Sequence, residues 1–258
     1  RLLDQVEGLK RPPTADPRSP GAGGAAVPRA ILFDVDGTLA ETERDGHRVA
    51  FNHAFAEAGL DWHWDEVRYG ALLAVTGGRE RIAWHARQAR PDWLAQPGAA
   101  ERITALHARK NALYAGIVRS GAIPLRPGVA ALFEALHAAG MRLGLVTTTS
   151  RSNLEVLLTS TLGTNALQRF AVIVCGEDVA RKKPDPEAYR LAMARLGLPA
   201  AACIAVEDSR NGLLAAHGAA VPTVIVRSLY TRGEDFREAA AVFDAYDPAL
   251  ATALGLAG

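Results

Sequence analysis

Apolar residues occur along this chain in short continuous runs that alternate with amphipathic stretches. The runs that predict buried strands are Ala30–Phe33, Met141–Val146, Ala171–Cys175, Cys203–Val206 and Thr223–Val226. The helices expected between them are Val129–Ala139, Asn153–Leu162, Pro186–Leu196 and Gly212–Ala220. Strands that are apolar on both faces and separated by helices indicate a parallel sheet covered on both sides. We therefore expect an α/β protein with a doubly wound, Rossmann-like core.

The segment between the first and second strands breaks this rhythm. It offers helical stretches with no convincing strand between them, at His47–Ala58, Arg79–Ala89 and Ala99–Val118. We expect an all-helical cap domain over residues 46–123, inserted into a core made of residues 29–45 and 124–258. An insert that leaves at the carboxyl end of the first strand lies over the edge where open α/β sheets bind ligands. The cap is therefore a natural lid.

Composition narrows the function classes. The chain has 258 residues, of which 49% are hydrophobic and 22% charged, and its net charge is +1. This balance argues against strong binding to nucleic acids or anionic membranes, and no apolar run reaches the roughly 18 residues of a membrane span. Residues 1–28 are rich in proline and glycine and hold little to bury, so we expect a disordered extension.

Two rare residue types are expected to be structural. Cys175 and Cys203 lie in apolar runs, which predicts buried, reduced cysteines on neighbouring strands. The tryptophans expected in the core of the cap, rather than at a substrate, are Trp62, Trp64 and Trp84.

Two carboxylates follow the first strand in Asp34-Val35-Asp36-Gly37-Thr38. Alternate residues of an extended segment point the same way, so Asp34 and Asp36 are expected to face one site. Carboxylates this close repel each other unless a cation lies between them, which favours an oxygen-seeking ion such as Mg²⁺. One carboxylate would then serve as a nucleophile and the other as a proton shuttle. The alternative is an ordinary Asp-Gly turn at a strand end.

Polar clusters also follow three later strands. The first is Thr147-Thr148-Thr149-Ser150, which would bind a phosphoryl oxygen or simply cap a helix. Lys183 lies beside Pro184 on a stiff segment and would hold a phosphate, unless it belongs to a solvated loop. Glu207-Asp208 would add metal ligands or merely begin a helix with acidic residues.

Their common position changes the interpretation. The carboxyl ends of parallel strands meet at one edge of the sheet, so we expect these clusters to converge. The residues concerned are Asp34, Asp36, Thr147, Lys183 and Asp208. Paired carboxylates, a hydroxyl, a lysine and a metal suit phosphoryl transfer, where positioning and charge neutralisation dominate.

In this order the motifs resemble the haloacid dehalogenase superfamily, over residues 29–230. The resemblance implies that Asp34 attacks phosphorus to give an aspartyl-phosphate. Asp36 would protonate the leaving sugar oxygen and then activate water, while Thr147 and Lys183 hold the phosphoryl group. The Mg²⁺ ligands implied are Asp34, the backbone carbonyl of Asp36, and Asp208, with Glu207 in or near that shell.

A narrower resemblance lies mainly in the cap. The segments similar to the CbbY group of xylulose-1,5-bisphosphate phosphatases are Glu41–Arg48, Trp64-Asp65, Tyr69-Gly70, Gly77–Arg81, Leu125–Gly128 and Tyr230-Thr231. The cap is also similar to that of beta-phosphoglucomutase, at Arg109-Lys110-Asn111. The candidates implied for binding the sugar or a second phosphate are Glu43, His47, Arg79, Lys110, Thr148 and Thr149. Alternatively, His47 begins a helix and Arg79 pairs with Glu80 or solvent.

The resemblance implies a Mg²⁺-dependent phosphatase that acts on a small sugar phosphate or bisphosphate, with xylulose 1,5-bisphosphate favoured. A hexose-phosphate mutase that uses the same aspartyl-phosphate is the main alternative, and a non-catalytic sugar-phosphate-binding regulator is a third. We expect no nucleic-acid or membrane partner and a monomeric state. The expected location is a bacterial cytoplasm, with a plastid stroma as the alternative.

Overall fold

The computed structural model describes residues 28–256, in which six parallel strands form one sheet. The strands are β1 (Ala30–Phe33), β2 (Arg142–Val146), β3 (Val172–Val174), β4 (Cys203–Glu207), β5 (Thr223–Val226) and β6 (Ala241–Phe243). Their order is β3-β2-β1-β4-β5-β6, so β1 is central and the chain winds outward in both directions. The predicted α/β, doubly wound fold is confirmed, although β6 was not predicted. Disorder was predicted for residues 1–28. All of these residues except Pro28 lie outside the part of the chain that the structure describes.

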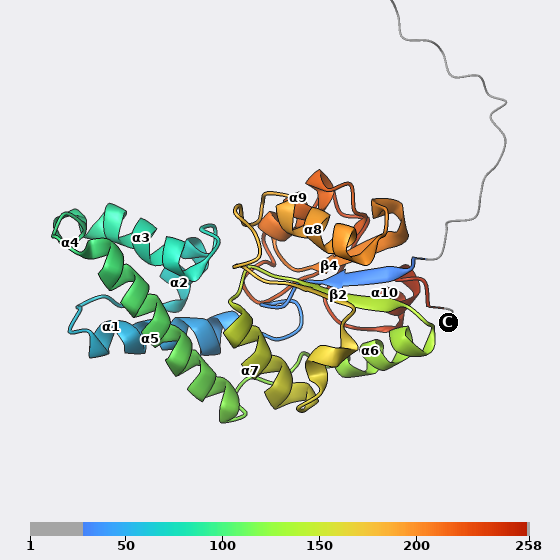
Figure 1. Cartoon of the computed structure of the whole chain (residues 1–258), viewed down its shortest axis with the longest axis horizontal. Helices are drawn as coiled ribbons and strands as arrows, with labels where there is room; N and C mark the ends of the chain where they lie inside the picture. Colours follow the sequence, from blue (N-terminus) through green and yellow to red (C-terminus); the bar gives the residue numbers. More distant parts are fainter. Residues whose placement is uncertain (1–27, 257–258) are drawn as a thin grey trace, which may run out of the picture.

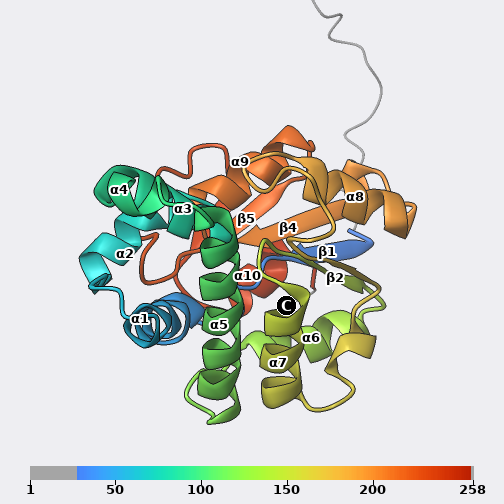
Figure 2. The same cartoon turned by 60° about the vertical axis from the view of Figure 1, so that its left-hand side comes forward.

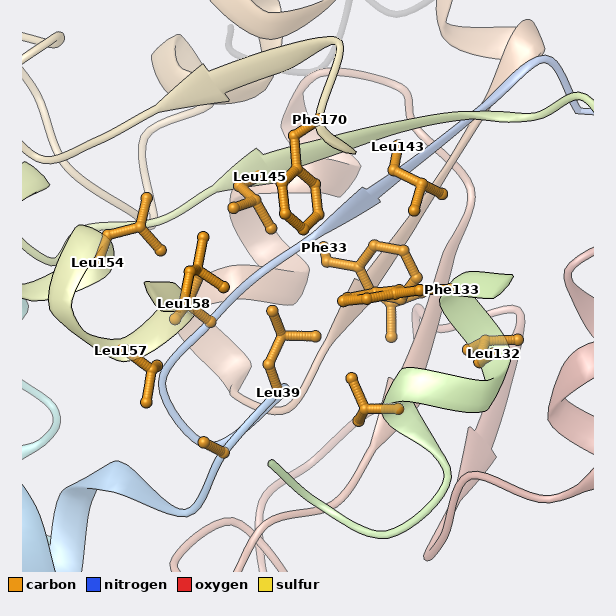
Figure 3. Close-up of a cluster of buried hydrophobic side chains, with 14 of the residues drawn as sticks. Phe33, Leu39, Leu132, Phe133, Leu143, Leu145, Leu154, Leu157, Leu158 and Phe170 are labelled. Atoms are coloured by element: carbon orange, nitrogen blue, oxygen red, sulfur yellow. The ribbon is translucent and has the colours of Figure 1, made fainter. Parts of the chain in front are cut away.

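Helices cover both faces of the sheet, as Figure 1 shows. On one face lie α6 (Val129–Ala138), α7 (Arg151–Leu162) and α10 (Pro248–Ala253); on the other lie α8 (Glu187–Leu196) and α9 (Arg210–Gly218). Alternate residues of β1 enter the two cores, with Phe33 on the first face and Leu32 on the second. Figure 3 shows the first core, where Phe33 meets Phe133 of α6 edge to face at 5.1 Å between ring centroids. Burial on both faces explains why β1 is continuously apolar.

The insert between β1 and α6 is entirely helical. Its elements are η1 (Glu43–His47), α1 (Arg48–Glu57), α2 (Glu66–Leu72), α3 (Gly78–Ala89), α4 (Pro91–Leu94) and α5 (Ala99–Arg119). The helical cap expected from the sequence is confirmed, and Figure 1 shows it beside the sheet-containing core. We keep residues 46–123 as its proposed extent, and residues 29–45 with 124–258 as the proposed core.

Two expectations about buried residues are partly wrong. Trp62 and Trp64 are buried in the cap as expected, but Trp84 is 39% exposed. The inner face of α3 is formed by Arg81, Ile82, His85 and Ala86, which leaves Trp84 on the outer face. Cys175, which directly follows β3, and Cys203, the first residue of β4, are buried and free. They do not lie on neighbouring strands, because β2 and β1 separate β3 from β4.

Helix α5 joins the cap to the core. It runs from α4 to the side of α7, as both views show (Figures 1 and 2). Val118 near its end is buried in the cluster that covers the first face of the sheet, and Asn153 of α7 donates a hydrogen bond to Asn111 at 3.1 Å. With 21 residues α5 is the longest helix described, but no helix of residues 28–256 is long and apolar enough to cross a membrane.

Candidate active site

The structure brings residues from three strand ends and one loop together at the carboxyl edge of the sheet. Lys183, in the loop after β3, donates to Asp34 Oδ1 at 2.7 Å and to Glu207 Oε1 at 2.6 Å. Its ammonium group also donates to the carbonyl of Val146, at the end of β2, at 2.7 Å. The side chains of Lys183, Asp34 and Glu207 are buried. Because its three acceptors come from the ends of three strands, the ammonium group of Lys183 is held in place. The attraction of Asp34 and Glu207 raises the pKa of Lys183 above its usual value against the effect of burial.

Three carboxylates form an acidic cluster around this lysine. Oxygens of Asp34, Glu207 and Asp208 lie within 4.8 Å of one another. Burial, and then the charge of Glu207, raise the pKa of Asp34 to about 7 although Lys183 opposes this. Burial and Asp34 likewise raise the pKa of Asp208 well above its usual value. A hard divalent cation would relieve this repulsion, so the donor set fits Mg²⁺.

The two carboxylate oxygens of Glu207 have different surroundings. Its Oε1 accepts from Lys183 and from the hydroxyl of Tyr189. Its Oε2 has no hydrogen-bond partner among the described residues and lies against α9, only 1.8 Å from where a Cβ on Gly212 would be. Glu207 therefore first anchors Lys183, and its place in or near the metal shell stays a prediction.

The turn after β1 depends on Gly37. This residue has φ +83°, a conformation that side chains disfavour. A Cβ at this position would lie 2.1 Å from Oδ2 of Asp208. Glycine thus lets the loop that carries Asp34 approach the strand end that carries Asp208.

Asp34 and Asp36 line the same small cavity of about 100 Å³ but have different neighbours. Asp36 accepts a hydrogen bond from Thr42 at 2.6 Å and lies 3.1 Å from Nε2 of His47. Burial alone would raise the pKa of Asp36, but His47 and Thr42 outweigh it and lower the pKa to about 2. Asp36 is therefore ionised and tied to the cap, whereas Asp34 is tied to Lys183.

The residues expected to bind the sugar or a second phosphate line a larger cavity of about 530 Å³. Its lining includes Glu43, His47, Arg79, Lys110, Thr148 and Thr149. It shares Asp36 and Thr148 with the small cavity, so the two hollows adjoin. Lys110 lies with Nζ 2.7 Å from Nδ1 of His47, and burial lowers the pKa of Lys110 to about 7.

The structure narrows the alternative roles of His47, Arg79 and Glu43. His47 does lie at the start of α1, but its ring also joins Asp36 to Lys110. Arg79 is exposed at the cavity and makes no ion pair among the described residues, whereas Glu80 pairs with Lys182. Glu43 accepts from the hydroxyl of Tyr69 at 2.5 Å.

The threonines after β2 divide between the turn and the cavity. Thr147 is buried, and its hydroxyl accepts from the backbone N–H of Thr149 at 3.1 Å. Thr148 lines both cavities and Thr149 the larger one. A direct contact of Thr147 with a phosphoryl group stays a prediction.

Two basic residues at the cavity were not predicted. Arg81 is buried, donates to the hydroxyl of Tyr69 at 2.9 Å, and lines both cavities. Lys182 lines the larger cavity. The spacing of Arg81 with the apolar Ile82 and Ala86 would have placed it on the inner face of α3, but nothing in the sequence distinguishes Lys182 from a solvated loop residue.

Comparison with known proteins identifies the class. Residues 28–220 match the haloacid dehalogenase-like hydrolases, so the chain belongs to that family. It is an enzyme, a phosphatase of the haloacid dehalogenase type, as the motifs predicted.

Particular relatives of the chain include CbbY proteins. The chain is 46% identical to Protein CbbY of Rhodobacter capsulatus over 211 residues, which cover 82% of this chain and 90% of that protein. It is 38% identical to a CBBY-like protein of Arabidopsis thaliana, covering 84% of this chain and 69% of that one. Among solved structures, CbbY from Rhodobacter sphaeroides in complex with phosphate matches with a TM-score of 0.79 and 44% identity, over 84% of this chain and 94% of that one. An aspartate-to-asparagine variant of that CbbY, in complex with xylulose-(1,5)bisphosphate, matches equally well.

Proposed function

We propose that this protein is a Mg²⁺-dependent phosphatase that dephosphorylates a small sugar bisphosphate, most favourably xylulose 1,5-bisphosphate. The observation that carries the proposal is the pairing of a reactive centre with a second, basic cavity. Asp34, Lys183 and Asp208 converge beside a small hollow, which adjoins the larger cavity under the cap. The CbbY structure with bound xylulose-(1,5)bisphosphate supports this choice of substrate.

In the first half-reaction, an Asp34 oxygen forms a bond to phosphorus and the bond from phosphorus to the sugar oxygen breaks. Lys183 balances the charge of the phosphoryl group. Asp36, which is ionised in the substrate-free protein, takes up a proton from solvent when the substrate binds and gives it to the leaving oxygen. The pKa of Asp36 is about 2 without substrate, and a nearby phosphate dianion raises it toward the protonated form this step needs. When bound at Asp34, Asp208 and the backbone carbonyl of Asp36, Mg²⁺ supplies further charge neutralisation.

In the second half-reaction, water attacks the aspartyl-phosphate. Asp36 removes a proton from the water, inorganic phosphate leaves, and the Asp34 carboxylate is restored. The hydrogen bonds from Thr42 and the contact with His47 keep Asp36 ionised, which suits a base. The same residue thus serves as acid and base in turn.

The larger cavity provides for the rest of the substrate. Charge-assisted bonds to a dianion are stronger than neutral ones, and Arg79 and Lys110 offer such donors. Glu43 would accept from sugar hydroxyls, with His47 and Thr149 beside them. This division assigns chemistry to the strand edge and substrate choice to the cap.

The proposal requires only a small-molecule substrate as partner. A monomeric state and a bacterial cytoplasm, or alternatively a plastid stroma, stay predictions, as does the lack of nucleic-acid and membrane partners. Size-exclusion chromatography with light scattering tests the monomeric state.

The proposal is tested by measuring phosphate release with Mg²⁺ in the wild type and in Asp34→Asn. The substrates are xylulose 1,5-bisphosphate, ribulose 1,5-bisphosphate, fructose 1,6-bisphosphate and β-glucose 1-phosphate. We expect the highest kcat/KM with xylulose 1,5-bisphosphate. Asp34→Asn should lose on the order of 10³-fold or more with every substrate, because the nucleophile is absent.

Asp61→Asn is the matched control, since Asp61 is exposed in the cap and pairs with Arg90 at the surface. Circular dichroism would show that both variants keep the fold. Substantial activity of Asp34→Asn would reject the nucleophile. Interconversion of β-glucose 1-phosphate without phosphate release would favour the mutase instead.

A further inference from the structure

An ion pair joins the loop after β3 to the cap. Lys182, which directly precedes Lys183, donates to Oε1 of Glu80 in α3 at 2.7 Å. The side chain of Lys182 is 25% exposed and that of Glu80 is 40% exposed. Lys183 is buried and bonded to Asp34 and Glu207, whereas the side chain of Lys182 is partly exposed at the cavity.

The side chains of Glu80 and Lys182 pack closely against the backbone of Gly77. A Cβ on Gly77 would lie 2.3 Å from Oε2 of Glu80 and 2.8 Å from Nζ of Lys182. The φ of +96° at Gly77 also favours glycine there. The chain therefore leaves room for this contact at the point where α3 begins.

Glu80 is an incompletely satisfied partner. One of its oxygens accepts from Lys182, but Oε2 is buried and has no hydrogen-bond partner among residues 28–256. A buried oxygen without a donor is unfavourable, so this pair is weaker than a fully bonded one. An anion with more accessible oxygens would compete well for Lys182.

The surroundings of the pair suit such an anion. Glu80 and Lys182 line the larger cavity together with Arg79 and His107. Burial, with the positive charges of Lys110 and Lys182, lowers the pKa of His107 to about 4, so His107 is neutral and can donate or accept a hydrogen bond. At this wall of the cavity, Glu80 is the acid placed against Lys182.

We propose that Lys182 binds the second phosphate of a bisphosphate substrate and that Glu80 takes the place of that phosphate in the substrate-free protein. This inference rests on the proposed function for the identity of the ligand. A phosphate dianion displaces Glu80 because it offers three acceptor oxygens and a larger charge. A monophosphate bound at Asp34 leaves the pair intact, so Lys182 discriminates in favour of bisphosphates.

The test separates the two phosphates of the ligand. The turnover of an aryl phosphate reports binding at Asp34, and xylulose 1,5-bisphosphate is added as a competitor. Its inhibition constant is obtained whether or not the protein hydrolyses it. Lys182→Met should weaken the bisphosphate about tenfold, the usual effect of losing a charged hydrogen bond. The KM of the aryl phosphate should stay within about twofold.

Glu80→Gln provides the second variant. It removes the competing charge, so the bisphosphate should bind about threefold more tightly while the KM of the aryl phosphate is unchanged. Arg181→Met is the matched control, because it removes an adjacent positive charge that pairs with Asp185 outside both cavities. It should leave both constants unchanged.

Three results would overturn the inference. Equal losses with both ligands in Lys182→Met would assign Lys182 to the support of the loop, and an unchanged inhibition constant would remove it from the binding site. Selectively weaker bisphosphate binding in Glu80→Gln would mean that Glu80 positions Lys182 rather than competing for it. If the wild type releases no phosphate from xylulose 1,5-bisphosphate, the proposed function fails, while the inhibition constants still decide the role of Lys182.

Discussion

Asp34 and Asp36 lie two positions apart but meet opposite electrostatic surroundings. Burial and the charge of Glu207 raise the pKa of Asp34 to about 7, whereas His47 and Thr42 lower the pKa of Asp36 to about 2 against the effect of burial. Groups whose pKa values are driven apart are suited to different tasks. Asp34 needs a cation to ionise fully, whereas Asp36 is ionised by its contacts with His47 and Thr42. The two carboxylates therefore depend on different parts of the chain.

Lys110 should make stability depend on pH. Its pKa is about 7 in the folded protein against a usual 10.5, so between these values the unfolded chain holds a proton that the folded protein has released. The free energy of unfolding should then rise with pH across this window, by at most about 1.4 kcal/mol per pH unit from this group. Lys110→Met should lack this rise. Urea denaturation of both proteins between pH 7 and 9, without Mg²⁺, measures the difference.

The control for this prediction is Arg109→Met. The guanidinium of Arg109 lies at the surface beside Glu57 and keeps its charge throughout the window. Its stability should follow that of the wild type. If the free energy of unfolding of Lys110→Met changed with pH in parallel with that of the wild type, the lowered pKa of Lys110 would be contradicted.

At the residue scale, the sequence was informative wherever a strand end determines position. Asp34, Lys183 and Asp208 could be predicted because parallel strands deliver their carboxyl ends to one edge. Lys182 could not, since its contact with Glu80 depends on how the cap is placed over the core. The pattern of apolar and polar residues along the chain does not predict where the cap lies relative to the core.

At the scale of elements, the return from the cap to the core is bound to the segment that follows β1. Leu125 forms an antiparallel bridge with Ala40 of that segment. The guanidinium of Arg126 donates to the carbonyls of Gly37, Val226 and Arg227 at 2.7, 3.1 and 2.7 Å. One arginine thus joins the linker, the turn after β1 and the end of β5.

Arg126→Met should lower kcat about tenfold for an aryl phosphate and leave KM within about twofold. It deprives three carbonyls of a charged donor, which loosens the turn at Gly37 and costs about 2 kcal/mol of stability. Steady-state kinetics and thermal denaturation measure these effects. Arg119→Met, at the exposed end of α5, should change neither. A normal kcat in Arg126→Met would show that the turn holds its geometry without this clamp.

Predictions of elements succeeded where the periodic pattern was long. Helices α3 and α5 were placed to within a residue at each end, because their apolar positions recur at helical spacing. Strand β6 has three half-buried residues at the sheet edge, and it begins with the last of three consecutive alanines, which favour helix. The short helix α2 was missed although Asp65 caps it, accepting from the N–H of Arg68 at 2.7 Å.

At the scale of the whole molecule, core and cap enclose the site between them. Two linkers connect them, and α5 adds a third connection by lying against α7. The insertion point predicted a lid, since it leaves from the carboxyl end of β1. The shape of the cavity depends on contacts between distant segments, such as that of Asn211 with Thr76 at 3.1 Å, and could not be predicted.

Mg²⁺ should stabilise the folded protein. A ligand that binds only the folded state at a hundred times its Kd adds about 2.7 kcal/mol to the free energy of unfolding. The thermal midpoint should therefore rise with Mg²⁺ and fall again with a chelator. Asp208→Asn should lose this response, while its Mg²⁺-free stability equals or exceeds that of the wild type because a buried repulsion is relieved. Asp92→Asn, in exposed α4, should respond normally. An unchanged Mg²⁺ response in Asp208→Asn would contradict the ligand set.

The two consecutive lysines of the loop after β3 place two positive charges a set distance apart. Lys183 faces the nucleophile and Lys182 reaches the cap, so one short piece of backbone sets the separation of the two ammonium groups. Under the inference drawn for Lys182, that separation acts as a ruler for the substrate. A carbon skeleton too short to span it leaves one charge unmatched, and a longer one has to bend. Selection by chain length would then reside in the core, and selection by stereochemistry in the cap.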